Sequence, residues 1–143
     1  MLSENGHITL TNRQLAKLWE SNAIKAVGSD ECRRKMSPRM SFSLSKVLRA
    51  VTQAVEDFYE ERNRLVRDCG DRDADGNLIG NENGGYKITD RREEFVTKVD
   101  QLADIRVSLN VSMLDLKVSA LPAGVFNPVD LAALADIINF VED

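Results

Sequence analysis

Acidic residues with a regular spacing stand between residues 71 and 82, in a segment rich in Asp, Asn and Gly. Asp at positions 1, 3 and 5, Gly at position 6 and Glu at position 12 match the template of an EF-hand calcium loop. In this segment the side chains that would coordinate calcium are Asp71, Asp73, Asp75, Asn77 and Glu82. A helix is expected before the segment, but Asn83-Gly84-Gly85 stands where the template needs a second helix.

The same segment also fits a β-hairpin. Asp75-Gly76 and Asn83-Gly84-Gly85 favour tight turns, because Asn, Asp and Gly tolerate the backbone angles that such turns require. The residues between and after these turns, 77–79 and 86–88, are β-prone. We expect the hairpin, and calcium binding stays the alternative.

Positive charge is densest between residues 33 and 39, in a polar segment that contains Pro38 and that we expect to be a connecting loop. Guanidinium and ammonium groups grouped in this way can hold the phosphates of a nucleotide. A solvated basic loop is the alternative. The cations of this cluster are Arg33, Arg34, Lys35 and Arg39.

Arg62 is a fifth candidate ligand-binding residue. It lies four residues after Phe58 and three before Leu65, which places it beside the apolar seam of a helix. An Arg in such a place is paired with a carboxylate, or is reserved for an anionic ligand or a subunit contact. The acidic total charge and the few aromatic residues disfavour nucleic acid as the main partner.

The sequence predicts no catalytic residues. It has one histidine, His7, near its start, and no Gly-rich phosphate loop, nucleophile elbow or pair of His ligands. Cys32 and Cys69 are too few for a disulfide framework or a zinc site, and we expect them to be reduced. We therefore expect a non-enzymatic protein with no cofactor, apart from the calcium alternative.

Length and composition indicate one globular domain over residues 1–143, with 43% apolar and 29% charged residues. No apolar run approaches the ~20 residues of a membrane helix, and Met1 to Gly6 lacks the features of a signal peptide, so we expect a cytoplasmic protein without membrane contact. Charge is uneven: residues 1–40 contain seven Lys and Arg against four Asp and Glu, and residues 71–143 seven against fourteen. Such asymmetry can steer an anionic partner or set subunits head to tail.

Helical periodicity dominates the chain. Thr11 and Gln14 have the spacing of a capping box, which opens a helix that we expect to end at Gly28. The longest apolar stripe predicts a second helix, from Ser41 or Ser43 to about Cys69. Its roughly 40 Å exceed the width of a compact domain of this size, so we expect part of it to pack on a second subunit of a homo-oligomer. Two further helices are expected, over 90–102 and over 128–141.

The strands are few. Residues 7–10 predict a short edge strand, and the alternation from Val107 to Met113 predicts a half-buried strand. The phase of this alternation flips at Leu114, which indicates a bulge or a change of face. No repeat is apparent along the chain. The expected fold class is α+β and helix-dominated, with about four helices, a small β-hairpin and an antiparallel strand.

Residues 41–143 combine a long helix, an Asp-Gly hairpin, an acidic helix, an alternating strand and a terminal helix opened by Pro. In this combination they resemble a class of small bacteriophage and prophage proteins that has no assigned function. Residues 1–40 are the variable part, since they depart from that class. The resemblance implies a phage origin and no activity, and it rests on Phe58, Glu61, Arg62, Leu65, Gly70, Asp75, Gly76, Tyr86, Phe95 and residues 127–131.

The function expected from these features is that of a non-enzymatic, phage-type binding protein in the host cytoplasm. It would counteract a host defence component by binding a host protein or by sequestering a small anionic, nucleotide-like signal. One alternative is an assembly or structural accessory protein of the virion. The other is a calcium-binding protein that uses the loop from Asp71 to Glu82.

Overall fold

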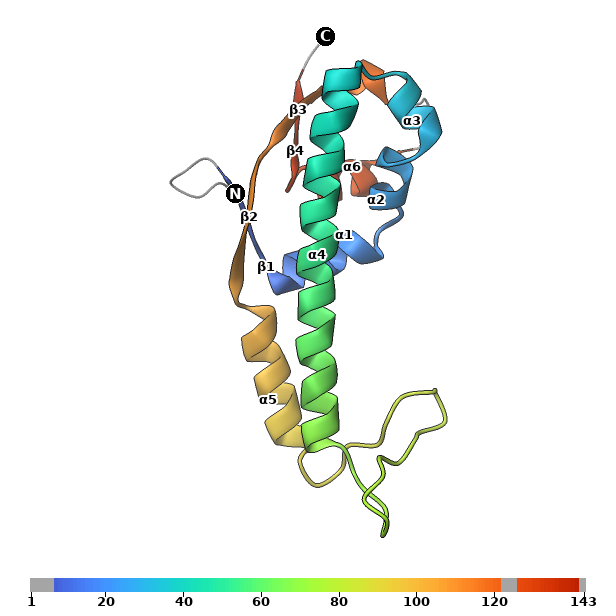
Figure 1. The fold of residues 1–143 in the computed structure, drawn as a ribbon, viewed down its shortest axis with the longest axis vertical. Helices are drawn as coiled ribbons and strands as arrows, with labels where there is room; N and C mark the ends of the chain where they lie inside the picture. Colours follow the sequence, from blue (N-terminus) through green and yellow to red (C-terminus); the bar gives the residue numbers. More distant parts are fainter. Residues whose placement is uncertain (1–6, 122–125, 142–143) are drawn as a thin grey trace. The chain divides into compact units, whose positions relative to one another are not determined.

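The longest element is helix α4, Pro38–Cys69, in a computed structural model that describes residues 7–121 and 126–141 (Figure 1). Its 32 residues correspond to about 48 Å of helix. The amide of Met40 donates to Oγ of Ser37 at 3.1 Å, which satisfies one free N–H of the first turn. Pro38 follows at the first helical position, where its missing N–H costs nothing. The helix therefore begins before Ser41, and the expectation that Pro38 interrupts a loop was wrong.

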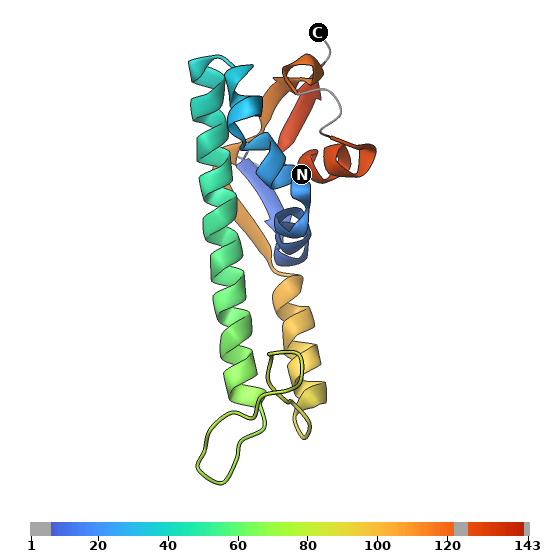
Figure 2. The same cartoon turned by 90° about the vertical axis from the view of Figure 1, so that its right-hand side faces the viewer.

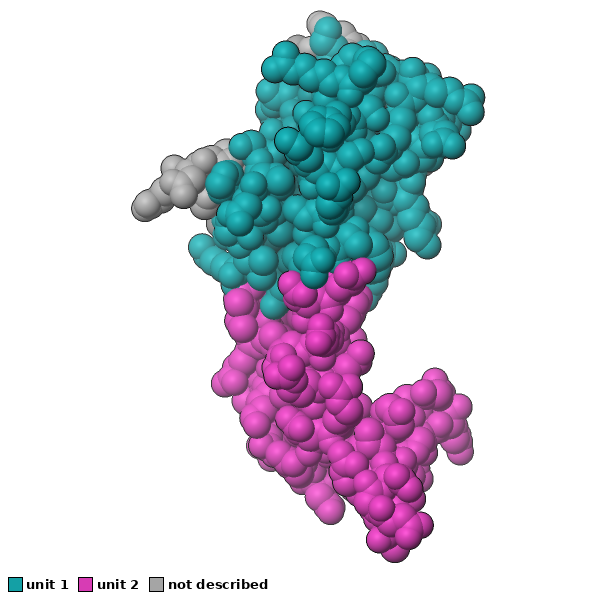
Figure 3. Space-filling model, viewed as in Figure 1, with its two compact units in different colours: residues 1–55, 106–143 teal, residues 56–105 magenta. Residues whose placement is uncertain are grey.

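The chain forms two compact units, coloured separately in Figure 3. Unit 1 comprises residues 1–55 and 106–143, and unit 2 comprises residues 56–105. Helix α4 contributes its first half to unit 1 and its second half to unit 2. The single domain expected over 1–143 stays a prediction. Among the described residues, no helix combines the length and the apolar character that crossing a bilayer requires.

Unit 1 begins with strand β1, His7–Thr11, and helix α1, Asn12–Glu20. The capping box is confirmed: the Gln14 amide donates to Thr11 Oγ1 at 3.1 Å, and the Thr11 amide donates to Gln14 Oε1 at 2.8 Å. The single helix expected up to Gly28 was wrong, because Ser21 has an extended backbone and separates α1 from helix α2, Asn22–Val27. The Ser21 hydroxyl and amide both donate to Leu18 O, so the side chain replaces the next helical turn.

Helix α3, Asp30–Arg34, occupies the segment that we expected to be a loop. Ser29 is its N-cap, and its Oγ accepts from the Cys32 amide at 3.3 Å. Acidic residues in the first turn and basic residues in the last suit the helix dipole. The loop prediction for this basic segment was therefore wrong. Helix α3 is short, and local capping and charge specify it.

Strand β2, Arg106–Ser112, pairs antiparallel with β1, which confirms both the expected edge strand and the alternating strand. Leu10 lies opposite Val107, and Thr9 lies opposite Ser108. Strand β3, Leu114–Lys117, follows after Met113, at the point where the apolar phase flips. A 3₁₀ turn, η1, Val118–Ala120, ends this part of the chain.

The C-terminal segment differs from the expected helix. Helix α6, Pro128–Leu134, opens as predicted, since Asn127 and Asp130 form a capping box. It ends at Leu134, however, and strand β4, Ile138–Val141, runs parallel to β3. The helix prediction for residues 135–141 was wrong because Ile138 is buried and pairs with Leu114, a partner distant in sequence.

The fold class is α+β, as predicted, with small strand pairs beside a helical majority (Figure 2). The described residues form six α-helices rather than about four, because the first helix is divided and α3 is added. In unit 1, apolar residues of β1, α1, α2 and the first half of α4 form the core together with residues of β2, β3 and α6. Its largest fully buried side chains are Ile8, Leu10, Leu15, Leu18, Val27, Leu44, Val51, Val55, Leu116, Leu134, Ile137 and Ile138.

Unit 2 consists of the second half of α4, a segment over residues 70–91, and helix α5, Arg92–Ala103. We expected this helix over 90–102, but it begins at Arg92, with Arg91 as its N-cap residue. Among the described apolar side chains of this unit, only Phe58, Cys69 and Ala103 are buried. A unit with so few buried residues gains little stability from its own core.

Gly70 allows the chain to turn sharply at the end of α4. A Cβ at this position would lie 2.6 Å from Cδ2 of Leu78 and 2.7 Å from the carbonyl oxygen of Val66. Both distances are shorter than van der Waals contact, and one of the two atoms belongs to the backbone. The close approach of residues 70 and 78 therefore requires glycine.

We predict that Gly70→Ala destabilises unit 2 by about 1–3 kcal/mol, the usual cost of overpacking. Hydrogen exchange of the amides in residues 56–105 measures the effect. The control is Gly80→Ala, because a Cβ there would meet its nearest atom, Gly85 O, at an ordinary 3.7 Å. Equal losses in the two variants would contradict the assigned packing.

Candidate functional site

Residues 71–86 form two successive copies of the same eight-residue turn. In the first copy, Asp73 Oδ1 accepts from the amides of Asp75 and Asn77, at 2.9 and 3.0 Å. In the second, Asn81 Oδ1 accepts from the amides of Asn83 and Gly85, both at 3.0 Å. The repetition lies in these hydrogen bonds, since the two copies share only the glycine at their sixth position as an identical residue.

The backbone of the two turns repeats as well. The glycine at the sixth position has a positive φ in both copies, 83° at Gly76 and 81° at Gly84, an angle that L-residues rarely adopt. The expected hairpin is confirmed, with antiparallel bridges between Arg72 and Leu78 and between Gly80 and Tyr86.

Three backbone hydrogen bonds join the two turns into one body. The Asp71 amide donates to Lys87 O at 2.8 Å, the Ile79 amide to Asp71 O at 3.0 Å, and the Lys87 amide to Ile79 O at 2.8 Å. Successive members of this set are eight positions apart. Asp71 and Ile79 each begin a turn, and Lys87 follows the second turn. The bonds form a closed ring that fixes both turns against each other.

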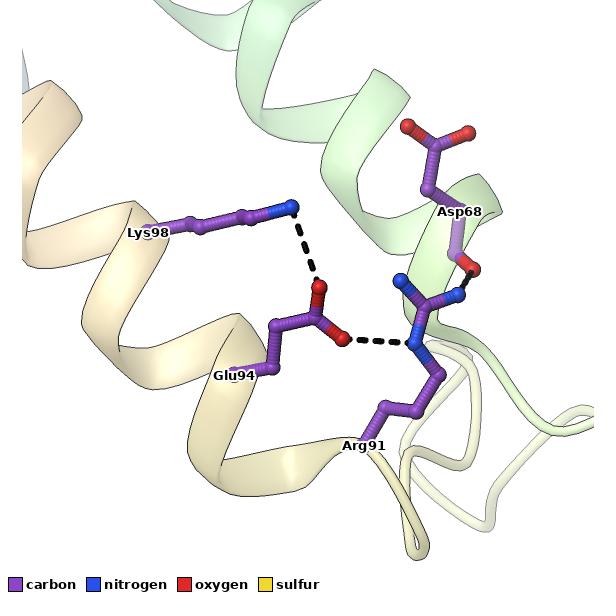
Figure 4. Close-up of polar contacts among 4 residues, drawn as sticks. All are labelled: Asp68, Arg91, Glu94 and Lys98. Carbon is purple, nitrogen blue, oxygen red and sulfur yellow. Dashed lines mark hydrogen bonds and ion pairs between the residues drawn. The ribbon is translucent and has the colours of Figure 1, made fainter.

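Two arginines contact the end of α4, one from the double turn and one from the start of α5. Arg72 donates to Arg67 O and to Gly76 O, both at 2.8 Å. Arg91 donates to Asp68 O and forms an ion pair with Glu94 at 2.7 Å (Figure 4). Free carbonyl groups at a helix C-terminus favour cations, so both contacts stabilise the end of α4.

Glu94 lies between two cations. Hydrogen bonds from Arg91 and Lys98 lower the pKa of the Glu94 carboxyl to about 2. Lys98 approaches the other carboxylate oxygen, at 3.1 Å (Figure 4). These three side chains link the start of α5 to the end of α4 within unit 2.

A groove of about 670 Å³ opens beside these contacts, wholly within unit 2. Apolar side chains from all three parts of the unit line it: Val66 of α4, Leu78, Tyr86 and Ile88 of the connecting segment, and Phe95 of α5. Polar groups are contributed by Arg62, Asn63, Arg67 and Asn81, and backbone by Gly84 and Gly85. The volume is within the range of sites for small molecules.

The groove is positively charged although unit 2 is acidic. Residues 56–105 contain fourteen Asp and Glu against eight Lys and Arg, yet the residues that line the groove include two arginines and no acid. The side chains of Arg62 and Arg67 are exposed and have no hydrogen-bond or ion-pair partner among residues 7–121 and 126–141. The site therefore has unused donors for an anion.

The second turn differs from the first where it meets this groove. In the first copy Arg72 holds the Gly76 carbonyl, but the equivalent of Arg72 in the second copy is Gly80, which has no side chain. The second turn consequently lacks this clamp, and its Gly84 and Gly85 line the groove. Tyr86 follows and is 49% exposed, so its ring can contact a bound molecule.

The predicted basic cluster belongs to unit 1, whereas Arg62 belongs to unit 2. Arg33 and Arg34 end α3, Lys35 is its C-cap residue, and Arg39 is in the first turn of α4. Arg33 is half-buried and donates to Ser45 Oγ at 2.8 Å, so this side chain links α3 to α4. Neither unit by itself brings the five predicted cations together.

The predicted calcium ligands have other roles in the double turn. Asp71 accepts from the amide and hydroxyl of Thr89, at 2.9 and 2.5 Å, and these bonds lower the pKa of its carboxyl. Asp73 caps the first turn through Oδ1. No group of three or more His, Cys, Asp or Glu side chains able to hold a metal occurs within the described parts of the chain. Calcium binding stays a prediction.

Comparison with protein-family models, curated proteins and solved structures gave no match. The resemblance to phage proteins therefore stays a prediction, and the site is interpreted from its own geometry.

Sequence analysis identified Arg62 but missed Arg67, Asn63, Asn81 and Tyr86. Helix spacing gave no signal for Asn63 and Arg67, since they lie one and five residues after Arg62 and such spacings do not place side chains on the same face. Asn81 and Tyr86 reach the groove only through the fold of the double turn. Cys32 and Cys69 are buried free thiols, and burial raises the pKa of Cys32.

We predict that Arg91→Ala raises the pKa of Glu94 from about 2 towards the ordinary carboxyl value of about 4.3, since Arg91 is the largest cause of the shift. Because the folded-state pKa is lowered, these ion pairs stabilise the fold above about pH 4.3 and are lost as the pH falls towards 2. Carboxyl NMR titration measures the midpoint. Lys98→Ala should raise the pKa of Glu94 less than Arg91→Ala does. A larger rise in Lys98→Ala than in Arg91→Ala would contradict the geometry.

We predict that millimolar calcium changes the melting temperature by less than about one degree, because Asp71 and Asp73 already hold backbone and side-chain donors. A calcium site at 100-fold excess of ligand over its Kd would add ~2.7 kcal/mol, which a melting curve detects. Magnesium is the control ion. A calcium-specific increase that Asp71→Ala and Asp73→Ala both abolish would establish the alternative.

Proposed function

We propose that this chain is a non-enzymatic binding protein whose unit 2 groove holds a small anionic, nucleotide-like ligand. The observation that supports this most directly is Arg62. It lies on the face of α4 that Phe58, Leu65 and Cys69 make apolar, yet its guanidinium has no partner among the described residues. An arginine that lies on an apolar helix face without a carboxylate partner fits a site in which a bound anion supplies the missing negative charge.

The other residues of the groove suit the same ligand. Arg67 lies more than one helical turn further along α4 and supplies a second guanidinium, so two anionic oxygens can be held at once. Tyr86, Ile88 and Phe95 offer an apolar surface for a flat ring, and Asn63 and Asn81 offer amide groups that can hydrogen-bond to it. The groove thus combines anion donors with a surface for a base-like ring.

For the biological role, we propose a phage-encoded protein of the host cytoplasm that counteracts a defence component by sequestering such a signal. Sequestration requires binding without turnover. The groove residues include no His, Cys, Asp or Glu that could act as a nucleophile or general base, which supports binding rather than catalysis. If no small anion binds, the two remaining alternatives are binding of a host protein and a role in virion assembly.

We predict that the double substitution Arg62→Ala, Arg67→Ala weakens binding of a nucleotide by about 2–4 kcal/mol, given ~1.5–3 kcal/mol for a hydrogen bond to a charged group. The measurement is calorimetric titration with mononucleotides, dinucleotides, pyrophosphate and inorganic phosphate. Arg64→Ala is the matched control, because Arg64 is on the same helix but pairs with Glu61 at 3.6 Å and is outside the groove.

Equal losses from Arg64→Ala and from the double variant would indicate bulk charge and contradict a defined site. A second arm neutralises Arg34 and Lys35, two exposed members of the basic cluster. If that change alone abolishes binding, the ligand site is the cluster in unit 1. If no anion in the panel binds the intact protein, the nucleotide-like ligand is refuted.

A further inference from the structure

Unit 1 contains a strongly basic segment that the groove does not use. Residues 32–55 all belong to this unit, and they include six Lys and Arg but no Asp or Glu. The segment runs from the end of α3 into the first half of α4, so it extends the basic cluster along the helix. Positive charge is thus concentrated in one part of unit 1.

The exposed side chains of this segment gather on one face of α4. From Arg39 to Arg49 they recur every three or four residues, a spacing that places side chains on the same side of a helix. Arg33 joins the end of α3 to α4, because it donates to Oγ of Ser45, which stands four residues before Arg49. Two exposed cations at the end of α3 therefore lie beside this face. We call the six exposed side chains the basic face: Arg34, Lys35, Arg39, Phe42, Lys46 and Arg49.

The basic face is free to bind a partner. None of its five cations forms an ion pair with a carboxylate within the parts of the chain that the structure describes. In Figure 1 the first half of α4 lies in front of the other elements of unit 1. Like charges that stand together repel one another, so a partner that supplies several negative charges in a row would be favoured.

Phe42 adds a second feature, which is a flat ring among cations. Its side chain is 64% exposed, and the ammonium group of Lys46 lies 4.9 Å from the centre of the ring. Exposed aromatic rings between cations are typical of surfaces that bind single-stranded nucleic acids, because the bases stack on the ring while the cations hold the phosphates.

We propose that the basic face binds single-stranded nucleic acid, with its cations on the phosphates and Phe42 stacked on a base. The acidic total charge disfavours nucleic acid only for the chain as a whole, since the acidic excess belongs to unit 2. Unit 1 contains eleven Lys and Arg against nine Asp and Glu, and unit 2 contains eight against fourteen. The basic face lies wholly in unit 1, so it is separate from the groove and independent of its ligand.

An anionic membrane fits this face less well. A helix that lies in a membrane surface needs a broad apolar side. In the first half of α4, however, Leu44, Val47 and Val51 are buried, and among the described residues of this half Phe42 is the one large apolar side chain that is exposed. A single ring suits stacking on a base better than insertion into lipid.

The test is fluorescence anisotropy of a labelled oligothymidylate, titrated with the intact protein at several salt concentrations. For a single strand, each phosphate that a cation neutralises contributes about −0.7 to the slope of log K against log salt. Five cations therefore predict a slope of about −3.5, which corresponds to about a hundredfold loss of affinity between about 50 and 200 mM salt.

Two variants separate charge from stacking. Arg39→Gln, Lys46→Gln should make the slope less steep by about 1.4, because two phosphate contacts are lost. Phe42→Ala should weaken binding by about tenfold and leave the slope unchanged, since it removes a stacked base but no phosphate contact. Phe42→Tyr should restore the affinity. The three side chains are exposed, so each variant should keep the fold, which a melting curve checks.

Two controls locate the binding. Lys17→Gln, Lys25→Gln removes the same charge from exposed positions of unit 1 that lie on α1 and α2, and it should change neither affinity nor slope. The groove variant Arg62→Ala, Arg67→Ala should also bind the oligonucleotide normally. If only the groove variant loses the oligonucleotide, the basic face is not the site and the proposal fails, whereas the groove remains an anion site.

Absence of oligonucleotide binding at low salt would overturn the proposal, as would equal losses in the basic-face variant and in the lysine control. A duplex that binds as tightly as the single strand, with no effect of Phe42→Ala, would contradict the stacking. Binding to vesicles of anionic phospholipid without binding to the oligonucleotide would assign the face to a membrane instead.

Discussion

A single constraint underlies this structure: helix α4 has one apolar seam over most of its 32 residues, and the described residues cover this seam more completely in unit 1 than in unit 2. In unit 1, strands and short helices bury Leu44, Val47 and Val51 completely or almost completely. In unit 2, Leu65 and Val66 are only half-buried. The incompletely covered part of the seam is where Arg62 stands and where the groove opens.

The shape of the groove follows from how the chain leaves α4. Gly70 permits a close approach to Leu78, and Arg72 and Arg91 satisfy the last carbonyl groups of the helix. The double turn is then fixed by the ring of backbone bonds among residues 71, 79 and 87. These contacts are polar and local, so they can hold the groove open where a larger apolar core would have closed it.

Sequence reasoning succeeded where structure is specified locally. The capping box at Thr11, the Pro-opened start of α6 and the Gly-based turns each depend on a few neighbouring residues. It failed where a partner distant in sequence determines the secondary structure. Residues 138–141, for example, form strand β4 because they pair with β3. Short elements were also missed: α3 has five residues and too little periodicity to detect.

The double turn shows a third kind of limit. Its two copies share an Asx residue at the third position and glycine at the sixth, but little else, so sequence identity between them is low. What repeats is the set of hydrogen bonds, and these become visible only in three dimensions. For the candidate site, one cation of the groove, Arg62, could be predicted from helix spacing. The residues of the second turn could not, because their place depends on the fold.

The most direct test of the central claim observes the guanidinium groups themselves. In a ¹⁵N-labelled sample, the Nε–Hε resonances of Arg62, Arg64 and Arg67 can be followed while pyrophosphate or a dinucleotide is added. The groove predicts that the signals of Arg62 and Arg67 shift together with one saturation curve, while that of Arg64 does not change. Shifts of equal size at all three arginines, or saturation at none, would contradict the claim that Arg62 and Arg67 form an anion site.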